Sequence, residues 1–308
     1  MTAEDASASK SETKTVIVFA GPNGSGKSTI NAKVLADPEL GFQGVYINAD
    51  DISKTLKGEF ASPRDQNIAA AIAAEELRLK CLAEGKSFAF ETVMSTPEKV
   101  ALMSQARSRG YDVHFVFVTT DDPEINVQRV ANRVALGGHD VPADAIRSRY
   151  ESAMRLLPVA IEQATSVLVY DNSAIGRDAI LVAHKMPNTD LEIMNTPATP
   201  AWAFERLQRD YDARRTSLAT LGQALKQEGF DPTKQSLNMA EASHGLNYDG
   251  RTVALTALHV LQEANKDKFV LHSRALMQDK TFRVGVYETV SYAYDKGKIK
   301  QLDLEKDR

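Results

Sequence analysis

The sequence predicts an α/β fold: a parallel sheet of about five strands with helices on both faces, followed by a smaller C-terminal α+β module. Short apolar segments alternate with helix-forming segments over residues 15–186, as in successive βαβ units. One segment, Val113 to Thr119, is apolar almost throughout, which is typical of a central strand buried on both faces. The pattern changes after Pro187, where a proline-rich stretch precedes a charged amphipathic helix over residues 201–228 and several short apolar segments.

The first predicted strand, Val16 to Ala20, runs into a glycine-rich loop that fits G-x-x-x-x-G-K-[ST], and a helix is expected over residues 28–36. In this strand-loop-helix context the pattern indicates a P-loop, as in P-loop NTPases and kinases, whose backbone N–H groups and helix N-terminus bind phosphate. We therefore expect an ATP site. Its predicted residues are Gly21, Pro22, Asn23, Gly24, Ser25, Gly26, Lys27, Ser28 and Thr29. Lys27 should reach the β- and γ-phosphates, and the Ser28 hydroxyl should ligate Mg²⁺.

The remaining predicted strands end in polar residues. These strands are Val45 to Asp50, Ser87 to Val93, Val113 to Thr119 and Val167 to Tyr170. Helices are expected over 64–84, from Pro97 to Gly110, from Pro123 and from Pro158. Ligands of such sheets bind at the carboxyl ends of the strands. The polar residues predicted at those ends are Asp50, Glu91 with Thr92, Asp121 and Asn172.

Two carboxylates suit transfer of a phosphoryl group to an acceptor. Asp50, fixed at a strand end, could orient and deprotonate an accepting hydroxyl; the alternative is a helix N-cap, for which Asp51 is the better candidate. Glu91 lies on an otherwise apolar strand and should be paired with an arginine, a metal or a substrate hydroxyl, unless the strand ends before it. Thr92 could bind the same substrate.

Arginines flank the glycine pair Gly137-Gly138, a plausible hinge. Arg129 and Arg133 are four residues apart and share a helix face, so we expect them, and then Arg147, to bind the triphosphate. His139 could contact phosphate or fill the turn. His114, within a strand, is expected in the core. The histidines and the single cysteine lack metal-ligand spacing, so Mg²⁺ is the metal expected.

Composition restricts the function further. The net charge of −4 gives no sign of nucleic-acid binding, and no apolar run approaches the roughly 20 residues of a membrane span, so we expect a cytoplasmic protein with neither kind of partner. Cys81 should be a buried thiol. The predicted organisation is a disordered tail (1–14), a P-loop domain (15–186), a linker (187–200) and a helix with a small β-rich module (201–308).

The sequence resembles the zeta toxin family, P-loop kinases whose characterised members phosphorylate UDP-N-acetylglucosamine. The similar stretches are residues 21–29, 47–52 (Ile-Asn-Ala-Asp-Asp-Ile), 90–92 (Phe-Glu-Thr), 126–142, 149–150 (Arg-Tyr) and 170–173 (Tyr-Asp-Asn-Ser). The resemblance implies that Asp50 is the base for the sugar hydroxyl, that Glu91 and Thr92 contact the sugar nucleotide, and that Arg129 is a lid arginine. His139 stands where the family has a second lid arginine, so Arg133 or Arg147 would supply that charge.

The resemblance also implies partners. A UDP-sugar would be the small-molecule acceptor, and either a separate antitoxin or residues 190–308 would neutralise the toxin. Residues 248–272 resemble the KfrB-type module of plasmid-borne proteins. Two other functions stay open at this point: a nucleotide-dependent ATPase or switch whose C-terminal module binds a partner or nucleic acid, and a kinase acting on a dinucleotide or nucleic-acid end.

Overall fold

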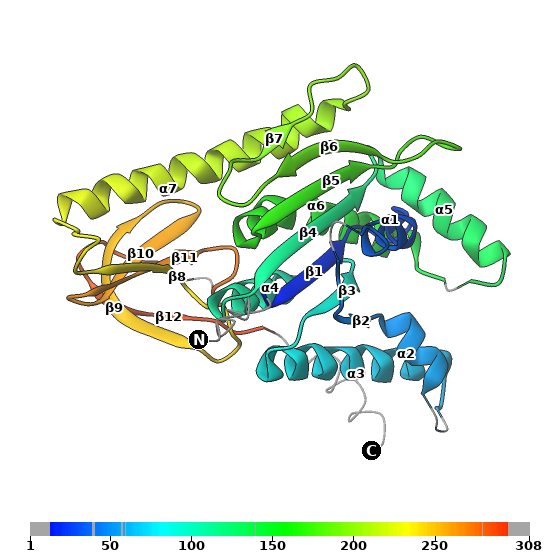
Figure 1. Ribbon diagram of the computed structural model, residues 1–308, viewed down its shortest axis with the longest axis horizontal. Helices are drawn as coiled ribbons and strands as arrows, with labels where there is room; N and C mark the ends of the chain where they lie inside the picture. Colours follow the sequence, from blue (N-terminus) through cyan, green and yellow to red (C-terminus); the bar gives the residue numbers. More distant parts are fainter. Residues whose placement is uncertain are drawn as a thin grey trace, which may run out of the picture.

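The computed structural model describes residues 13–38, 41–56, 58, 60–138, 140–278 and 280–294, with only the backbone for residues 63 and 64. A seven-stranded sheet lies at its centre, in the order β2-β3-β1-β4-β5-β6-β7 (Figure 1). Its strands are β1 (Thr15–Ala20), β2 (Val45–Ile47), β3 (Phe88–Thr92), β4 (Asp112–Thr119), β5 (Ser166–Asp171), β6 (Ile180–Lys185) and β7 (Glu192–Ile193). The five predicted strands are confirmed and run parallel; β6 and β7 add an antiparallel extension that the sequence did not indicate.

Helices cover both faces of this sheet, as predicted. They are α1 (Lys27–Leu35), α2 (Ala49–Thr55), α3 (Pro63–Glu84), α4 (Pro97–Ser108), α5 (Pro123–Ala135) and α6 (Ala143–Gln163). Because side chains alternate along a strand, Ile17 and Phe19 pack with Ile30 of α1 on one face, whereas Val16 and Val18 pack with α4 and α6 on the other. Helix starts follow their local sequence: the Asp122 side chain caps α5 directly before a proline at the first helical position.

Three predicted boundaries were wrong. Pro158 does not begin a helix but lies inside α6. The strand predicted over 45–50 ends at Ile47, because Asn48 caps α2 and turns the chain into a helix. Residues 282–286, within one of the short apolar segments predicted for the C-terminal module, form a loop with a turn at residues 284 and 285, and the strand begins only at Tyr287. The proposed linker, 187–200, contains β7, which is hydrogen-bonded to the edge of the sheet. Most of the predicted tail, residues 1–12, lies outside the described residues.

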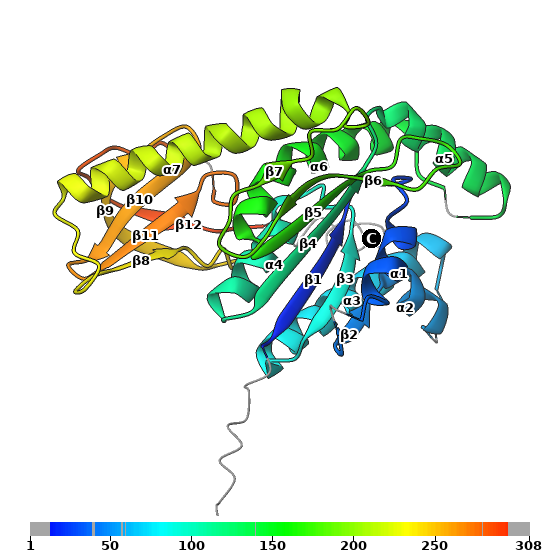
Figure 2. The ribbon, with the colours of Figure 1, turned by 45° about the horizontal axis from the view of Figure 1, so that its top comes forward.

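The C-terminal module combines one long helix with a second sheet. A π-helical turn η1 (Ala203–Gln208) leads into α7 (Arg209–Gln227), whose later part lies along the second sheet (Figure 2). That sheet has the order β12-β9-β10-β11-β8. Its strands are β8 (Ser236–Met239), β9 (Asn247–Leu255), β10 (His259–Asn265), β11 (Lys268–Ser273) and β12 (Tyr287–Ser291). No described helix is both long enough and apolar enough to cross a bilayer.

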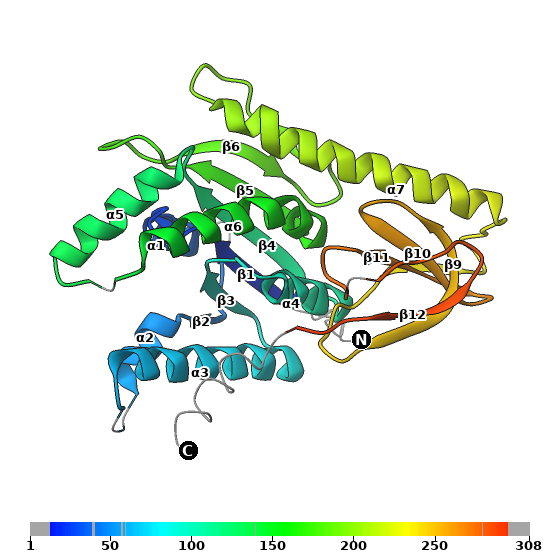
Figure 3. The same ribbon diagram turned by 180° about the vertical axis from the view of Figure 1, so that it is seen from behind.

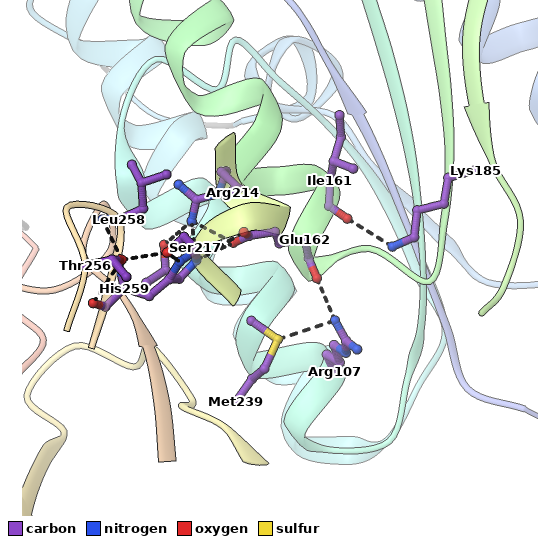
Figure 4. Close-up of polar contacts among 11 residues, drawn as sticks. Arg107, Ile161, Glu162, Lys185, Arg214, Ser217, Met239, Thr256, Leu258 and His259 are labelled. Carbon is purple, nitrogen blue, oxygen red and sulfur yellow. Dashed lines mark hydrogen bonds and ion pairs between the residues drawn. The ribbon is translucent and has the colours of Figure 1, made fainter. Parts of the chain in front are cut away.

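The C-terminal module packs against the end of the first sheet where β1 and β4 begin, far from the loop that follows β1 (Figures 1 and 3). Its contacts reach the C-terminal ends of α4 and α6: the Ser104 hydroxyl donates to the carbonyl oxygen of Ala240 (2.9 Å), and Glu162 is paired with Arg214 of α7 (2.6 Å) and His259 of β10 (3.1 Å) (Figure 4). The Glu162 and Arg214 side chains are 6% and 5% exposed. Buried charges therefore join the two parts.

Candidate functional site

The glycine-rich loop connects β1 to α1 at the carboxyl end of the sheet, and two of its glycines are required by close approach. Gly21 has φ +147°, and a Cβ there would overlap the carbonyl oxygen of Val118 in β4. Gly26, with φ +88°, leaves no room for a Cβ beside the amide of Asn172. Both conformations are ones that other residues rarely adopt. The loop is therefore packed tightly against the strands, as the P-loop prediction requires.

Side chains from the following strands and helices hold the loop in place. Asn172, directly after β5, donates to the Ser25 carbonyl oxygen (2.8 Å) and so lies beside the loop. Asn126 of α5 donates to the Asn23 carbonyl oxygen (2.6 Å). The backbone of Thr92, at the end of β3, accepts from the Gly21 N–H (3.2 Å), while the Thr92 hydroxyl accepts from the N–H of Met94.

Several donors around the loop are left for an anion. Among the described residues, the Lys27 ammonium donates only to the carbonyl oxygens of Gly21 (2.8 Å) and Pro22 (3.0 Å), positions from which it can turn toward phosphate. Within the described part of the chain, the buried Ser25 hydroxyl and the buried Nη1 of Arg129 have no hydrogen-bond partner. Because buried polar groups are almost always paired, these atoms fit the oxygens of a bound triphosphate.

Burial and several neighbouring charges act on the Lys27 ammonium. Burial lowers its pKa to about 8; the charges of Glu91 and Asp50 act to raise this pKa, and that of Arg133 lowers it. Charges from three predicted residues, on α2, β3 and α5, therefore act on the ammonium of α1. Two carboxylates and an arginine near a phosphate-binding lysine are the groups that phosphoryl transfer uses.

Asp50 lies in a helix, and not at the end of a strand as was predicted. It lies in the first turn of α2, exposed, and its backbone N–H donates to the side chain of Asn48 (2.8 Å). The prediction that Asp51 caps the helix was wrong: Asn48 is the cap, and Asp51 pairs with Lys54 (2.7 Å). A helix start beside the strand end still presents the Asp50 carboxylate near Lys27.

Glu91 lies within β3, so the prediction that it ends an apolar strand is confirmed. Among the described residues its hydrogen-bond partners are Tyr46 and Asn48, and its pairing with an arginine, a metal or a substrate hydroxyl stays a prediction. The Tyr46 hydroxyl donates to Oε1 at 2.5 Å, and the Asn48 amide donates to the same oxygen at 3.4 Å. Sequence reasoning missed Tyr46, because a tyrosine on a short strand gives no signal by itself; its position two residues before the cap was the only clue.

The arginines divide between two roles. Arg147 pairs with Glu124 (2.6 Å) and Asp144 (2.9 Å), which raises its pKa; its contact with the triphosphate stays a prediction. Arg149 instead donates to the Asn23 side chain (3.2 Å). The two arginines are two residues apart on α6 and hence on different sides of that helix, and the sequence did not show which side faces the loop. Nothing is described of His139, which lies outside the described residues.

Other predictions concern metals and the core. Ser28 is exposed in the first turn of α1, and the described residues contain no group of three His, Cys, Asp or Glu side chains that could hold a metal ion. Mg²⁺ commonly binds through one protein group and the substrate phosphates, which fits a lone hydroxyl.

His114 is half-buried with Nδ1 2.5 Å from the Ser166 hydroxyl, and burial lowers its pKa. Cys81 is buried, as predicted.

Comparison with known proteins gives two family matches and several distant structural neighbours. Residues 2–177 match the family model described as Zeta toxin, and residues 247–301 match that of the KfrB domain, which confirms both resemblances. An uncharacterized protein of Haemophilus influenzae is 28% identical over 134 residues, which are 44% of this chain and 91% of that protein.

Among solved structures, a chain of the AvrRxo1-ORF1:-ORF2 complex with ATP has a TM-score of 0.48 and 15% identity, over 59% of this chain and 61% of that chain. A chain from the PezAT toxin-antitoxin system of Streptococcus pneumoniae has a TM-score of 0.43 and 17% identity, over 68% of this chain and 88% of that chain. The present chain thus spans about three fifths of the AvrRxo1 chain.

Proposed function

The chain belongs to the zeta toxin family, and on that premise we propose that it is an ATP-dependent phosphotransferase that transfers the γ-phosphoryl group to a hydroxyl of UDP-N-acetylglucosamine. The observation that carries this proposal is that the charges of Asp50, Glu91 and Arg133 all act on the Lys27 ammonium beside the glycine-rich loop. A nucleotide switch needs phosphate-binding groups but no carboxylate to deprotonate an alcohol. The two acidic side chains therefore favour a kinase over an ATPase.

The residues have distinct tasks in the transfer. The acceptor hydroxyl oxygen attacks the γ-phosphorus, the bond from that phosphorus to the β–γ bridging oxygen breaks, and ADP leaves. Asp50 orients the hydroxyl and takes its proton. Lys27 and Arg129 stabilise the charge on the transferring group, and Arg133 adds a further cation from α5. When bound at Ser28, Mg²⁺ would neutralise charge on the β- and γ-phosphates.

The position of the C-terminal module supports a separate antitoxin as the neutralising partner. Ser104 and Glu162, near the C-terminal ends of α4 and α6, contact the module, and the second sheet lies beyond the end of the first sheet opposite α1 (Figure 3). The second sheet is therefore held away from the P-loop, whereas Trp202, before α7, donates to Asp171 beside Asn172. Inhibition by the second sheet is the less favoured of the two arrangements.

Acceptor labelling tests the proposal. Purified protein would be incubated with γ-labelled ATP and a panel of UDP-sugars, nucleotides, dinucleotides and oligonucleotides, and labelled products identified by mass spectrometry. Asp50→Asn should abolish transfer and keep ATP binding, whereas Lys27→Ala should impair both. Hydrolysis without any labelled acceptor would support the ATPase, and unchanged turnover in Asp50→Asn would remove this residue from its role.

A further inference from the structure

A second group of polar side chains involves Glu91 and its partner Tyr46. It consists of Asn31 of α1, Tyr46 of β2, Asn48 at the start of α2 and Glu91 of β3. Oε1 of Glu91 accepts from both Tyr46 and Asn48. Within the described residues no hydrogen bond to Oε2 is made. The carboxylate is therefore held by one oxygen, and the other is available to a ligand.

The Asn31 side chain is a buried amide without a hydrogen-bond partner among the described residues. Its side chain is 2% exposed, and neither Oδ1 nor Nδ2 has a hydrogen-bond partner in the described part of the chain. A buried amide with both polar atoms unpaired is costly and calls for a specific reason. Asn31 lies four residues after Lys27, on the same face of α1, so the unpaired amide lies on the helix face that carries the phosphate-binding lysine.

Tyr46 connects these groups. Burial and the hydrogen bond to Glu91 raise the pKa of Tyr46 to about 12, while the side chains of Asn48 and Asn31 act to lower it. The phenol is therefore protonated at neutral pH and serves as a donor. With its hydrogen directed at Glu91, Tyr46 sets the orientation of the carboxylate.

We propose that Asn31 and Tyr46 select the acceptor in this site: Asn31 binds it directly and Tyr46 is a positioning residue that acts through Glu91. The group recognised would be neutral and would both donate and accept hydrogen bonds, as a sugar hydroxyl or an acetamido group does. An amide offers one donor side and one acceptor side, whereas Glu91 and Asp50 repel an anionic group. This inference rests on the proposed function, because it takes the acceptor to be the ligand beside Glu91.

Binding and stability measurements on the full chain test the proposal without requiring turnover. Isothermal titration calorimetry would measure the Kd of UDP-N-acetylglucosamine with a non-hydrolysable ATP analogue bound. Asn31→Leu, which keeps the shape of the side chain, should weaken binding of the sugar nucleotide by about tenfold or more and leave the Kd of the ATP analogue unchanged. The melting temperature should stay the same or rise, because an unpaired buried amide is removed.

Tyr46→Phe should weaken UDP-N-acetylglucosamine binding by about fivefold to tenfold, as Glu91 loses its orientation. Tyr287→Phe, on the exposed edge strand β12, is the control and should change nothing. An unchanged Kd in both Asn31→Leu and Tyr46→Phe would overturn the proposal, and so would absence of binding to the wild-type chain. Binding with these effects but without phosphoryl transfer would overturn the proposed function alone.

Discussion

Glu162 near the end of α6 and Arg214 on α7 form an ion pair of 2.6 Å in which neither side chain is more than 6% exposed. Nη2 of the arginine also donates to the Ser273 hydroxyl (2.7 Å), and His259 contacts both Glu162 and Arg214. Removing one partner of a buried pair leaves the other charge without compensation. The docking of the module therefore depends on all three charged or polar groups together.

The first prediction compares two neighbouring arginines on α7. Arg214→Met should lower the free energy of unfolding by about 3–5 kcal/mol, because Glu162 would remain buried and partly unpaired. Arg215, whose ion pair with Asp190 is more than half exposed, provides the control, and Arg215→Ala should cost about 0–1 kcal/mol. Urea denaturation checks both; equal effects would contradict the assignment of the buried pair.

Stability should fall in acid in a way that depends on Glu162. Burial raises the pKa of its carboxyl, but hydrogen bonds from His259 and Arg214 outweigh burial and leave the pKa below its usual value. A carboxyl with a lowered pKa in the folded state contributes its full stability above the unfolded pKa, about 4.3, and loses it as the pH falls through the folded pKa. Glu162→Gln should flatten this acid limb in urea midpoints recorded from about pH 6 to pH 3. An identical limb would rule out the linkage.

ATP binding should weaken in alkaline solution because of Lys27. Its pKa near 8 in the nucleotide-free protein is lowered chiefly by burial, so the ammonium is intact below that pH and is lost above it. Phosphate favours the charged form, and binding near pH 8 should therefore take up a proton. Calorimetry in buffers of different ionisation enthalpy measures this uptake. Lys27→Arg, which keeps its charge, should show none.

A methyl group at Gly21 should disrupt the loop. Gly21→Ala brings Cβ into the carbonyl oxygen of Val118 and also requires φ +147° of an alanine, so ATP affinity should fall by at least about tenfold. Gly110→Ala is the matched control, because Gly110 also has a positive φ (+77°) but its Cβ would meet nothing within 4 Å. That variant should lose some stability and keep ATP binding, as measured by fluorescence titration with a nucleotide analogue.

Two arginines on α6 should differ in their effect on ATP. Arg149→Ala removes the hydrogen bond to Asn23 in the loop and should raise the KM for ATP severalfold. Arg147→Ala removes ion pairs to Glu124 and Asp144 and should leave that KM nearly unchanged. If Arg147→Ala had the larger effect, this division of roles between the two arginines would be wrong.

The sequence was sufficient where the chemistry is local. The P-loop residues 21–29 carry their own geometry, and the apolar run of β4 indicates its central position, so the parallel part of the sheet could be predicted. The position of Asp50 could not be predicted from the sequence. Whether Asp50 ends the strand or begins a helix depends on Asn48, whose side chain accepts from the Asp50 N–H and caps α2.

Long-range contacts account for the remaining misses. Tyr46 and Glu91 are 45 residues apart, and only the pairing of β2 with β3 brings them together. The same holds for Glu162 and His259, which are separated by 97 residues. The side of α6 that faces the P-loop also depends on tertiary packing, so the sequence did not show that Arg149 contacts Asn23 in the loop.

The buried Glu162 also determines where the chain can be divided. A shortened chain that stopped within residues 187–200 would keep Glu162 and the apolar surface of α4 but lose Arg214 and His259, and so would expose a carboxylate next to unprotected hydrophobic side chains. The P-loop part would then need residues 201–308, supplied as a separate polypeptide, to pair this carboxylate and cover these side chains. We therefore expect the P-loop part and the C-terminal module to fold as a single unit.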